Sequence, residues 1–242
     1  MFEVEFLGIN GSIQERDSGN TSIIVKSDLV SIIVDVSVNI QEAVESDIDI
    51  VILTHWHIDH VYALPSLLHQ LWLKGRKKEL EIILPEGIRS SVDALIDLFA
   101  LRKKRGIFPI KIINASHHEY DCLSITTFKT DHTDDSIGVV FENNGRKLVY
   151  TSDTRPIKDA YTLLLNANML IHEASGLSMN EEELIKQGHS SGLDAGVFAR
   201  QAMAEKLFIC HLPTKDKELI LEEARGQFNN SQLPRLLEYY KV

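Results

Sequence analysis

The spacing of apolar and polar side chains divides the chain into segments of strand and helix. Residues 1–7 alternate between apolar and polar side chains, as a half-buried strand does. Segments 21–26 and 29–36 are rich in branched side chains, which is also typical of strands. Ser27 and Asp28 separate the last two segments, which predicts a hairpin. The run 49–53 is apolar and branched throughout, so we expect a buried strand there.

The rest of the chain alternates between the two kinds of element. Apolar runs predict strands at 80–84, 109–113, 122–128, 136–142, 147–151, 169–171 and 207–210. Helical spacing predicts helices after Pro65, in 91–102, after Asn180, after Ser191 and in 216–228. Asn144 and Gly145 predict a tight hairpin, because Asn-Gly is the strongest short hairpin signal. We expect His117 and His118 to lie in a solvated turn between two strands.

This order of elements favours a single domain over residues 1–242. Strands come first, strands and helices then alternate, and neither an internal repeat nor a low-complexity linker interrupts them. A chain of 242 residues can bury a sizeable core, and 44% hydrophobic with 25% charged residues is ordinary globular composition. We therefore expect an α/β fold with helices outside packed sheets.

Composition limits the location and the partners of the protein. No apolar run approaches the roughly 20 residues of a membrane span, and the first residues are acidic where a signal peptide is basic, so we expect a cytoplasmic protein without a membrane partner. Cys122 and Cys210 are expected to be buried thiols. The net charge of −10 disfavours general nucleic-acid binding. We interpret the basic clusters 74–78 and 102–105 as solvated helix ends, although the second could be an exosite.

Four metal-ligand side chains follow the strand 49–53 within six positions: His55, His57, Asp59 and His60. The first three should project to one side of an extended segment, and His60 can turn toward a second centre. Imidazole and carboxylate donors in this density suit zinc or a similar metal. A loop of surface histidines is the alternative, but several such groups buried at a strand end without a metal would be unpaired.

Polar residues also end other apolar strands. Asp35 lies inside the apolar run 32–36, where its carboxylate needs a partner. A metal-bound histidine often donates its second ring N–H to such a carboxylate, so Asp35 either supports a ligand in this way or is a turn residue. His132, Asp153 and His211 each follow a predicted strand, and parallel strands would bring these ends together.

The His-x-His-x-Asp-His run resembles the signature of the metallo-β-lactamase superfamily. The resemblance implies a four-layer αββα sandwich with a two-metal hydrolytic site, holding two Zn²⁺ ions or Mn²⁺ in their place. Carried over residue by residue, it assigns His55, His57 and His132 to one metal, Asp59, His60 and His211 to the other, and Asp153 to a bridge between them. A glutamate in place of His57 would suit a di-iron, oxygen-handling relative, so the imidazole favours hydrolysis over redox chemistry.

Within that superfamily, segments 131–139, 152–156, 172–174 and 188–191 resemble the motifs of ribonuclease Z. The resemblance implies that His189 donates a proton to the leaving oxygen and that Glu173 orients His189. Asp59, besides binding metal, could accept the proton of the nucleophile. A histidine suits the acid role because its ordinary pKa is near 6.5, although His189 could instead be a surface residue at a helix N-terminus.

Two departures from ribonuclease Z concern how the substrate is held. The Asn144-Gly145 turn leaves no room for the long arm that grips tRNA in that family, so we expect none. Residues 212–216 also replace the Ser and Arg-Tyr that follow the family's last histidine. A smaller phosphodiester is therefore a rival to tRNA, as in the compact cyclic phosphodiesterases of phosphonate breakdown.

The sequence therefore predicts a two-metal phosphodiesterase similar to ribonuclease Z. It would act as a tRNA 3′-end endonuclease, or on another RNA 3′ end or a small or cyclic diester. A lactone or other ester hydrolase on the same dizinc site is the main alternative, and a non-catalytic RNA-binding relative is another. The family often forms dimers, so a homodimer is also expected.

Overall fold

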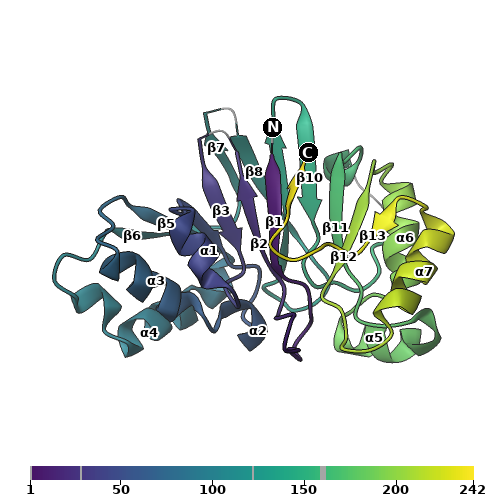
Figure 1. The fold of residues 1–242 in the computed structure, drawn as a ribbon, viewed down its shortest axis with the longest axis horizontal. Coiled ribbons are helices and arrows are strands. Elements are labelled where there is room, and N and C mark those ends of the chain that lie inside the picture. Colours follow the sequence, from purple (N-terminus) through teal and green to yellow (C-terminus); the bar gives the residue numbers. More distant parts are fainter. Residues whose placement is uncertain (1, 28, 122, 159–161) are drawn as a thin grey trace.

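The computed structural model describes residues 2–27, 29–121, 123–158 and 162–242. Within these ranges the strands form two seven-stranded sheets (Figure 1). The first sheet has the order β14 (Tyr239–Lys241), β1 (Glu3–Gly8), β2 (Ser22–Lys26), β3 (Ser31–Val34), β4 (Ile50–Ile52), β5 (Leu80–Leu84) and β6 (Ile110–Asn114). The second has the order β13 (Ser231–Gln232), β12 (Leu207–Cys210), β11 (Met169–Glu173), β10 (Arg146–Tyr150), β9 (Ile137–Asn143), β8 (Leu123–Lys129) and β7 (His117–Tyr120).

Helices lie outside both sheets, on opposite sides of the molecule (Figure 1). On the side of the first sheet lie α1 (Ile40–Glu45), α3 (Leu64–Leu73) and α4 (Arg89–Leu98). On the side of the second lie α5 (Glu181–Gln187), α6 (Gly192–Gln201) and α7 (Lys217–Gln227). The short α2 (Ile58–Val61) lies at the lower edge of the molecule in Figure 1. Short 3-10 turns are η1 (Glu86–Ile88), η2 (Leu101–Lys103), η3 (Thr162–Leu164) and η4 (Ser178–Asn180). The predicted αββα sandwich is confirmed.

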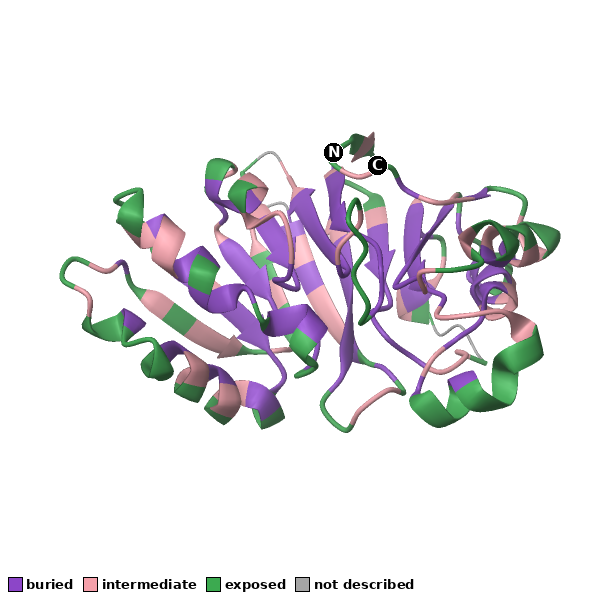
Figure 2. Ribbon diagram, turned by 60° about the horizontal axis from the view of Figure 1, so that its bottom comes forward, coloured by how far each residue is buried: buried purple, intermediate pink, exposed green. Residues whose placement is uncertain are grey.

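Alternation along the strands explains these layers. Phe6 belongs to the core between the sheets, whereas its neighbour Leu7 packs toward the helices on the outer face. Ile32 and Ile33 on β3 divide in the same way. Both faces of these central strands are therefore buried, which Figure 2 shows as continuous purple along them. Burying each such side chain contributes roughly 1.5–3 kcal/mol to folding.

Strand direction gathers the polar strand ends at one edge of the sandwich. β3 to β6 are parallel, and so are β10 to β13. β8 also runs in the direction of β10, because both pair antiparallel with β9. The segments that follow β3, β4, β8, β10, β11 and β12 thus meet at the lower edge in Figure 1.

Some local expectations were wrong. His117 and His118 lie in the edge strand β7, where cross-strand pairing with Thr126 and Ile125 of β8 overrides their preference for a turn. Arg76 is buried rather than solvated, because its guanidinium binds the Asp47 carboxylate.

Other local expectations gain detail. Asn180 is the N-cap residue of α5, but its side chain makes no capping hydrogen bond. Cys210 is a buried free thiol, as expected, whereas Cys122 lies outside the described residues. Of the helices in the described ranges, none has the length and apolarity that a membrane crossing requires.

Candidate metal centre

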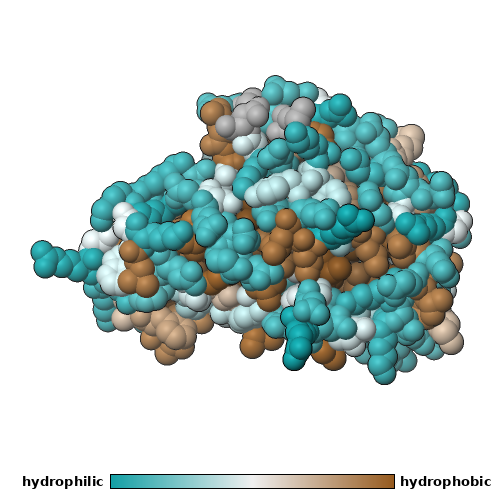
Figure 3. Space-filling view, viewed as in Figure 1, coloured by the Kyte–Doolittle hydropathy of each residue, from teal (hydrophilic) through white to brown (hydrophobic). Residues whose placement is uncertain are grey.

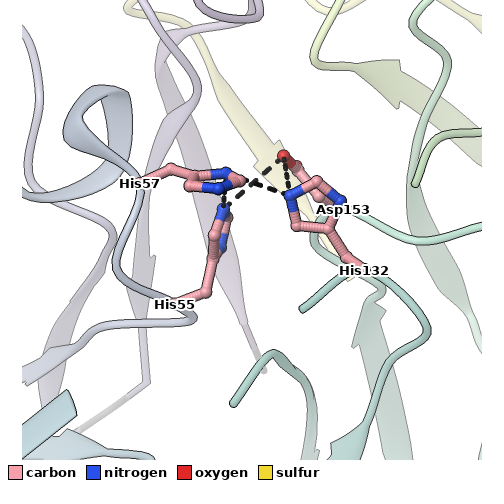
Figure 4. Close-up of side chains that lie close together, drawn as sticks. All are labelled: His55, His57, His132 and Asp153. Atoms are coloured by element: carbon pink, nitrogen blue, oxygen red, sulfur yellow. Dashed lines mark hydrogen bonds and ion pairs between the residues drawn. The ribbon is translucent and has the colours of Figure 1, made fainter. Parts of the chain in front are cut away.

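Three histidines and one aspartate converge at the lower edge of the sandwich (Figure 4). His55 and His57 follow β4, His132 follows β8 and Asp153 follows β10. The Nδ1 atom of His57 lies 3.1 Å from Nε2 of His55 and 3.0 Å from Nε2 of His132. The Oδ2 atom of Asp153 is 3.7 Å from Nε2 of His55 and 3.7 Å from Nε2 of His132. One donor atom from each residue therefore faces a common point.

A second group lies on the other side of Asp153. Asp59 and His60 are on α2, and His211 follows β12. The Oδ2 atom of Asp153 is 3.5 Å from Nε2 of His60 and 3.1 Å from Nε2 of His211. The Oδ2 atom of Asp59 lies 3.6 Å and 3.5 Å from the same two nitrogens. Asp153 thus lies between two clusters of potential ligands.

The donor atoms of both groups fit divalent metal ions. The Nε2 atoms of His60 and His211 and the Oδ1 atom of Asp153 are buried without a hydrogen-bond partner. Leaving such groups unpaired costs free energy, and cations bound beside them would remove that cost. Imidazole nitrogens with carboxylate oxygens are the donors that zinc prefers in catalytic sites. The two groups could therefore hold two ions with a shared carboxylate.

Hydrogen bonds behind one histidine of each group fix how the two rings point. Nδ1 of His60 lies 2.7 Å from Oδ2 of Asp35, whose Oδ1 accepts the backbone N–H of Thr54 at 2.8 Å. Nδ1 of His132 donates to the Gly188 carbonyl at 2.9 Å. With both Nδ1 atoms engaged, the Nε2 atoms of the two rings face the centre, where a metal would bind.

The electrostatics of the site follow from burial and from opposed charges. Burial alone would raise the pKa of Asp153, but His211 and His60 outweigh it and hold the pKa well below its usual value. Burial opposes a charge on His60, yet Asp153 and Asp35 outweigh it and raise the pKa of His60 well above normal. A buried carboxylate thus attracts positive charge to this point, and a metal that binds there would release the proton of His60.

Glu173 and His189 form a hydrogen-bonded pair beside the second group. Glu173 ends β11, and its Oε1 atom lies 2.9 Å from Nδ1 of His189 and 2.8 Å from the backbone N–H of Thr154, which donates to it. Burial lowers the pKa of His189, but the Glu173 carboxylate outweighs this effect and raises it to about 9. The Glu173 carboxylate therefore favours an imidazolium at His189, whose ring stacks on that of His211 and which lies close to Asp153.

Three supporting residues could not be assigned from the sequence. Ser175 donates its hydroxyl hydrogen to Oε2 of Glu173 at 2.9 Å, and its oxygen lies 2.9 Å from Nδ1 of His211. Thr54 binds the Asp35 carboxylate through both its backbone and its hydroxyl. Ser12 donates to Oδ2 of Asp59 at 3.2 Å. Ser175 and Thr54 adjoin the motifs that carry Glu173 and His55, which was the only available signal.

The backbone around the site is held in costly conformations. Asp35, Ser152 and His211 have φ values of 57°, 55° and 52°, in the left-handed region that non-glycine residues rarely adopt. Such residues cost on the order of 1–3 kcal/mol each and cluster at functional sites. Gly188 has φ +88°, and a Cβ there would lie 2.6 Å from Nδ1 of His132, so this position needs glycine.

Fold and site together define a metallohydrolase of the αββα type. The family model described as "Beta-lactamase superfamily domain" matches residues 34–212, so the chain belongs to that superfamily. Ribonuclease Z of Picrophilus torridus is 26% identical in an alignment that covers 98% of this chain and 95% of the relative. These findings confirm the prediction of a superfamily hydrolase from the ribonuclease Z-like branch.

Solved structures agree on the fold. The metallo-β-lactamase fold protein YhfI from Bacillus subtilis has a TM-score of 0.81 at 21% identity, over 99% of this chain and 98% of that chain. Human tRNase Z, short form, has a TM-score of 0.80 at 19% identity, over 99% of both chains. At this identity the likeness shows the fold and leaves the substrate to be argued from the site.

Proposed function

We propose that the protein is a two-metal phosphodiesterase of the ribonuclease Z type. His55, His57 and His132 would hold one ion, Asp59, His60 and His211 the other, and Asp153 both. The observation that carries the proposal is the pairing of this two-cluster donor set with the Glu173–His189 dyad, whose nitrogen-to-oxygen distance is 2.9 Å. Zinc is the metal we expect from the donor set, with manganese as an alternative.

The bound ions would supply Lewis acidity, polarising the phosphoryl oxygens and lowering the pKa of water from 15.7 in bulk toward about 7. The chain supplies proton transfer and orientation. Asp59 accepts a hydrogen bond from the attacking water. Because His211 and His60 outweigh burial and lower the pKa of Asp59, this carboxylate orients the water more than it takes its proton. His189 protonates the departing oxygen, and Glu173 holds the ring in place.

We infer that the substrate is a small diester or an exposed RNA 3′ end, because the protein has no arm between β9 and β10 to grip a folded tRNA. β9 and β10 are joined by Asn144 and Gly145 alone. The alignment with the Picrophilus relative extends over 294 positions although this chain has 242 residues, so the relative carries segments that this chain lacks. The net charge of −10 also supports a substrate with few phosphates. A homodimer and a cytoplasmic location remain predictions.

The test is a substrate panel with the zinc- or manganese-loaded protein. The panel contains bis(p-nitrophenyl) phosphate, a dinucleoside monophosphate, a 3′-extended precursor tRNA and a series of lactones. The proposal expects diester hydrolysis that Asp153→Ala abolishes. Turnover of lactones without any diester would favour the alternative ester hydrolase. A folded protein that binds metal but turns over nothing would favour the non-catalytic alternative.

A further inference from the structure

A cavity of about 260 Å³ opens beside the second group of donors, next to His189 and His211. The segment after β1 forms one wall, and the segment after β12 forms another. Besides the two histidines, the side chains around it belong to Ser12, Ile13, Gln187, Leu212, Pro213 and Thr214. Three of these belong to the segment 212–216, where the chain departs from the ribonuclease Z pattern.

The lining is neutral apart from the histidines. Among the described residues that line the cavity there is no Lys, Arg, Asp or Glu. Lys215, which directly follows Thr214, is exposed and is not part of the lining, and Lys217 is engaged by Asn10 and Glu15. Hydroxyl and amide groups of Ser12, Gln187 and Thr214 alternate with apolar faces. The cavity therefore offers hydrogen bonds and apolar surface. Apart from His189, whose proton goes to the leaving oxygen, its described lining offers no side-chain cation that would hold another phosphate.

The position of His189 decides which part of a substrate enters the cavity. In the hydrolysis, a water oxygen forms a bond to phosphorus, and the bond from phosphorus to the leaving oxygen breaks. The leaving oxygen keeps the electron pair of the broken bond and takes the proton of His189. The attacking water releases one proton to solvent, and His189 takes a proton back from solvent. The products are an alcohol and a phosphate monoester. Because the proton donor lines the cavity, the alcohol and not the monoester must be the part that occupies it.

We propose that this cavity is the leaving-group subsite and that it accepts one uncharged, hydroxyl-bearing group of nucleoside size. The proposal rests on the proposed function. A volume of about 260 Å³ lies just below the roughly 300–1,000 Å³ of pockets that enclose drug-sized ligands, which suits one nucleoside or sugar rather than several nucleotides. Ser12, Gln187 and Thr214 would bind its hydroxyls, and Pro213 with the exposed Ile13 would pack against its ring.

The first experiment places charge on one side of the scissile bond. Product analysis of a dinucleoside monophosphate identifies which nucleoside leaves. An extra terminal phosphate is then added either to the leaving nucleoside or to the retained one, which gives two substrates of equal charge. We expect kcat/KM to fall at least about tenfold when the phosphate is on the leaving nucleoside, and to change less than about threefold when it is on the retained one. A tenfold effect is of the size by which contacts in a pocket discriminate between substrates. Equal effects would overturn the proposal.

The second experiment fills the cavity. The dinucleoside monophosphate is compared with a methyl ester of the same retained nucleotide, whose leaving group is methanol. We expect the wild-type protein to prefer the dinucleoside at least about tenfold, and Thr214→Trp to remove that preference. Leu219→Trp, at an exposed position of α7 outside the cavity, should retain it. A preference that survives Thr214→Trp would overturn the subsite, whereas failure to hydrolyse either ester or bis(p-nitrophenyl) phosphate would refute the proposed function itself.

Discussion

Replacing His189 by alanine tests the proton-donor role through its dependence on the leaving group. The variant removes the imidazole that Glu173 holds at 2.9 Å, and it leaves the seven proposed metal ligands in place. A dinucleoside monophosphate releases an alkoxide, which needs a proton as the bond breaks. Bis(p-nitrophenyl) phosphate releases a nitrophenolate, which is stable as an anion at neutral pH. Loss of the acid should therefore affect the first substrate far more than the second.

The magnitude follows from the state of His189 in the structure. With a pKa of about 9, its imidazole is protonated in roughly 99 of 100 molecules at pH 7. The full contribution of a general acid, about 10²- to 10⁴-fold in rate, is then available to the wild-type protein. This corresponds to about 2.7–5.4 kcal/mol of transition-state stabilisation. We expect kcat for the dinucleoside to fall by that factor and kcat for the aryl diester to fall less than about tenfold.

The assay measures kcat and KM of both substrates for the metal-loaded variant, with metal content determined on the same samples. His117→Ala is the matched control, because His117 is an exposed histidine of the edge strand β7. Equal losses for the two substrates at full metal content would refute the proton-donor role. A loss that follows a drop in metal content would instead make His189 a metal ligand, as its closeness to Asp153 and His211 allows.

The remaining predictions concern pH, metal binding and stability. Activity toward alkoxide leaving groups needs protonated His189, so it should be present below the pKa of His189 and lost above it. Glu173→Gln removes the carboxylate that raises this pKa, so it should move the alkaline limb of the kcat profile to lower pH. An unmoved limb would contradict the pairing of Glu173 with His189. Asp35→Asn weakens the acceptor of the His60 ring N–H and should lower metal affinity roughly 10–100-fold in a chelator competition. Unchanged affinity would mean that Asp35 is only a turn residue. Gly188→Ala forces a side chain into φ +88° and against the neighbouring imidazole, so chemical denaturation should show a loss of more than about 1 kcal/mol. Gly226→Ala, in an open position on α7, should not destabilise the protein, and equal losses in both variants would refute the steric argument.

The individual strands and helices could be predicted because each depends on local sequence. Buried strands such as 49–53 are apolar throughout, and helices show their own spacing. The proposed ligands could also be predicted as candidates, because His55, His132, Asp153 and His211 follow apolar runs closely and His57, Asp59 and His60 share the His-x-His-x-Asp-His run with His55. Parallel strand order then brings His55, His132, Asp153 and His211 to one edge, which explains why residues more than 150 positions apart lie together.

The supporting hydrogen bonds could not be predicted, because they depend on side-chain positions across the fold. Ser175 reaches His211 over 36 positions, and Ser12 reaches Asp59 over 47. Neither serine differs in the sequence from an ordinary loop residue. The error at His117 has the same origin: its polarity favours a turn, whereas pairing with β8 places it in a strand. The leaving-group cavity likewise results from two loops that only the fold brings together.

The measurement that tests the central claim most directly combines metal content with diester turnover on one preparation. The protein is loaded with zinc or manganese and freed of unbound metal. Bound metal per chain and the rate of bis(p-nitrophenyl) phosphate hydrolysis are then determined for wild type and Asp153→Ala. We predict two ions per wild-type chain with diester hydrolysis, and loss of both metal and activity in the variant. Fewer than one ion per chain, or two ions without hydrolysis of any phosphodiester, would contradict the account.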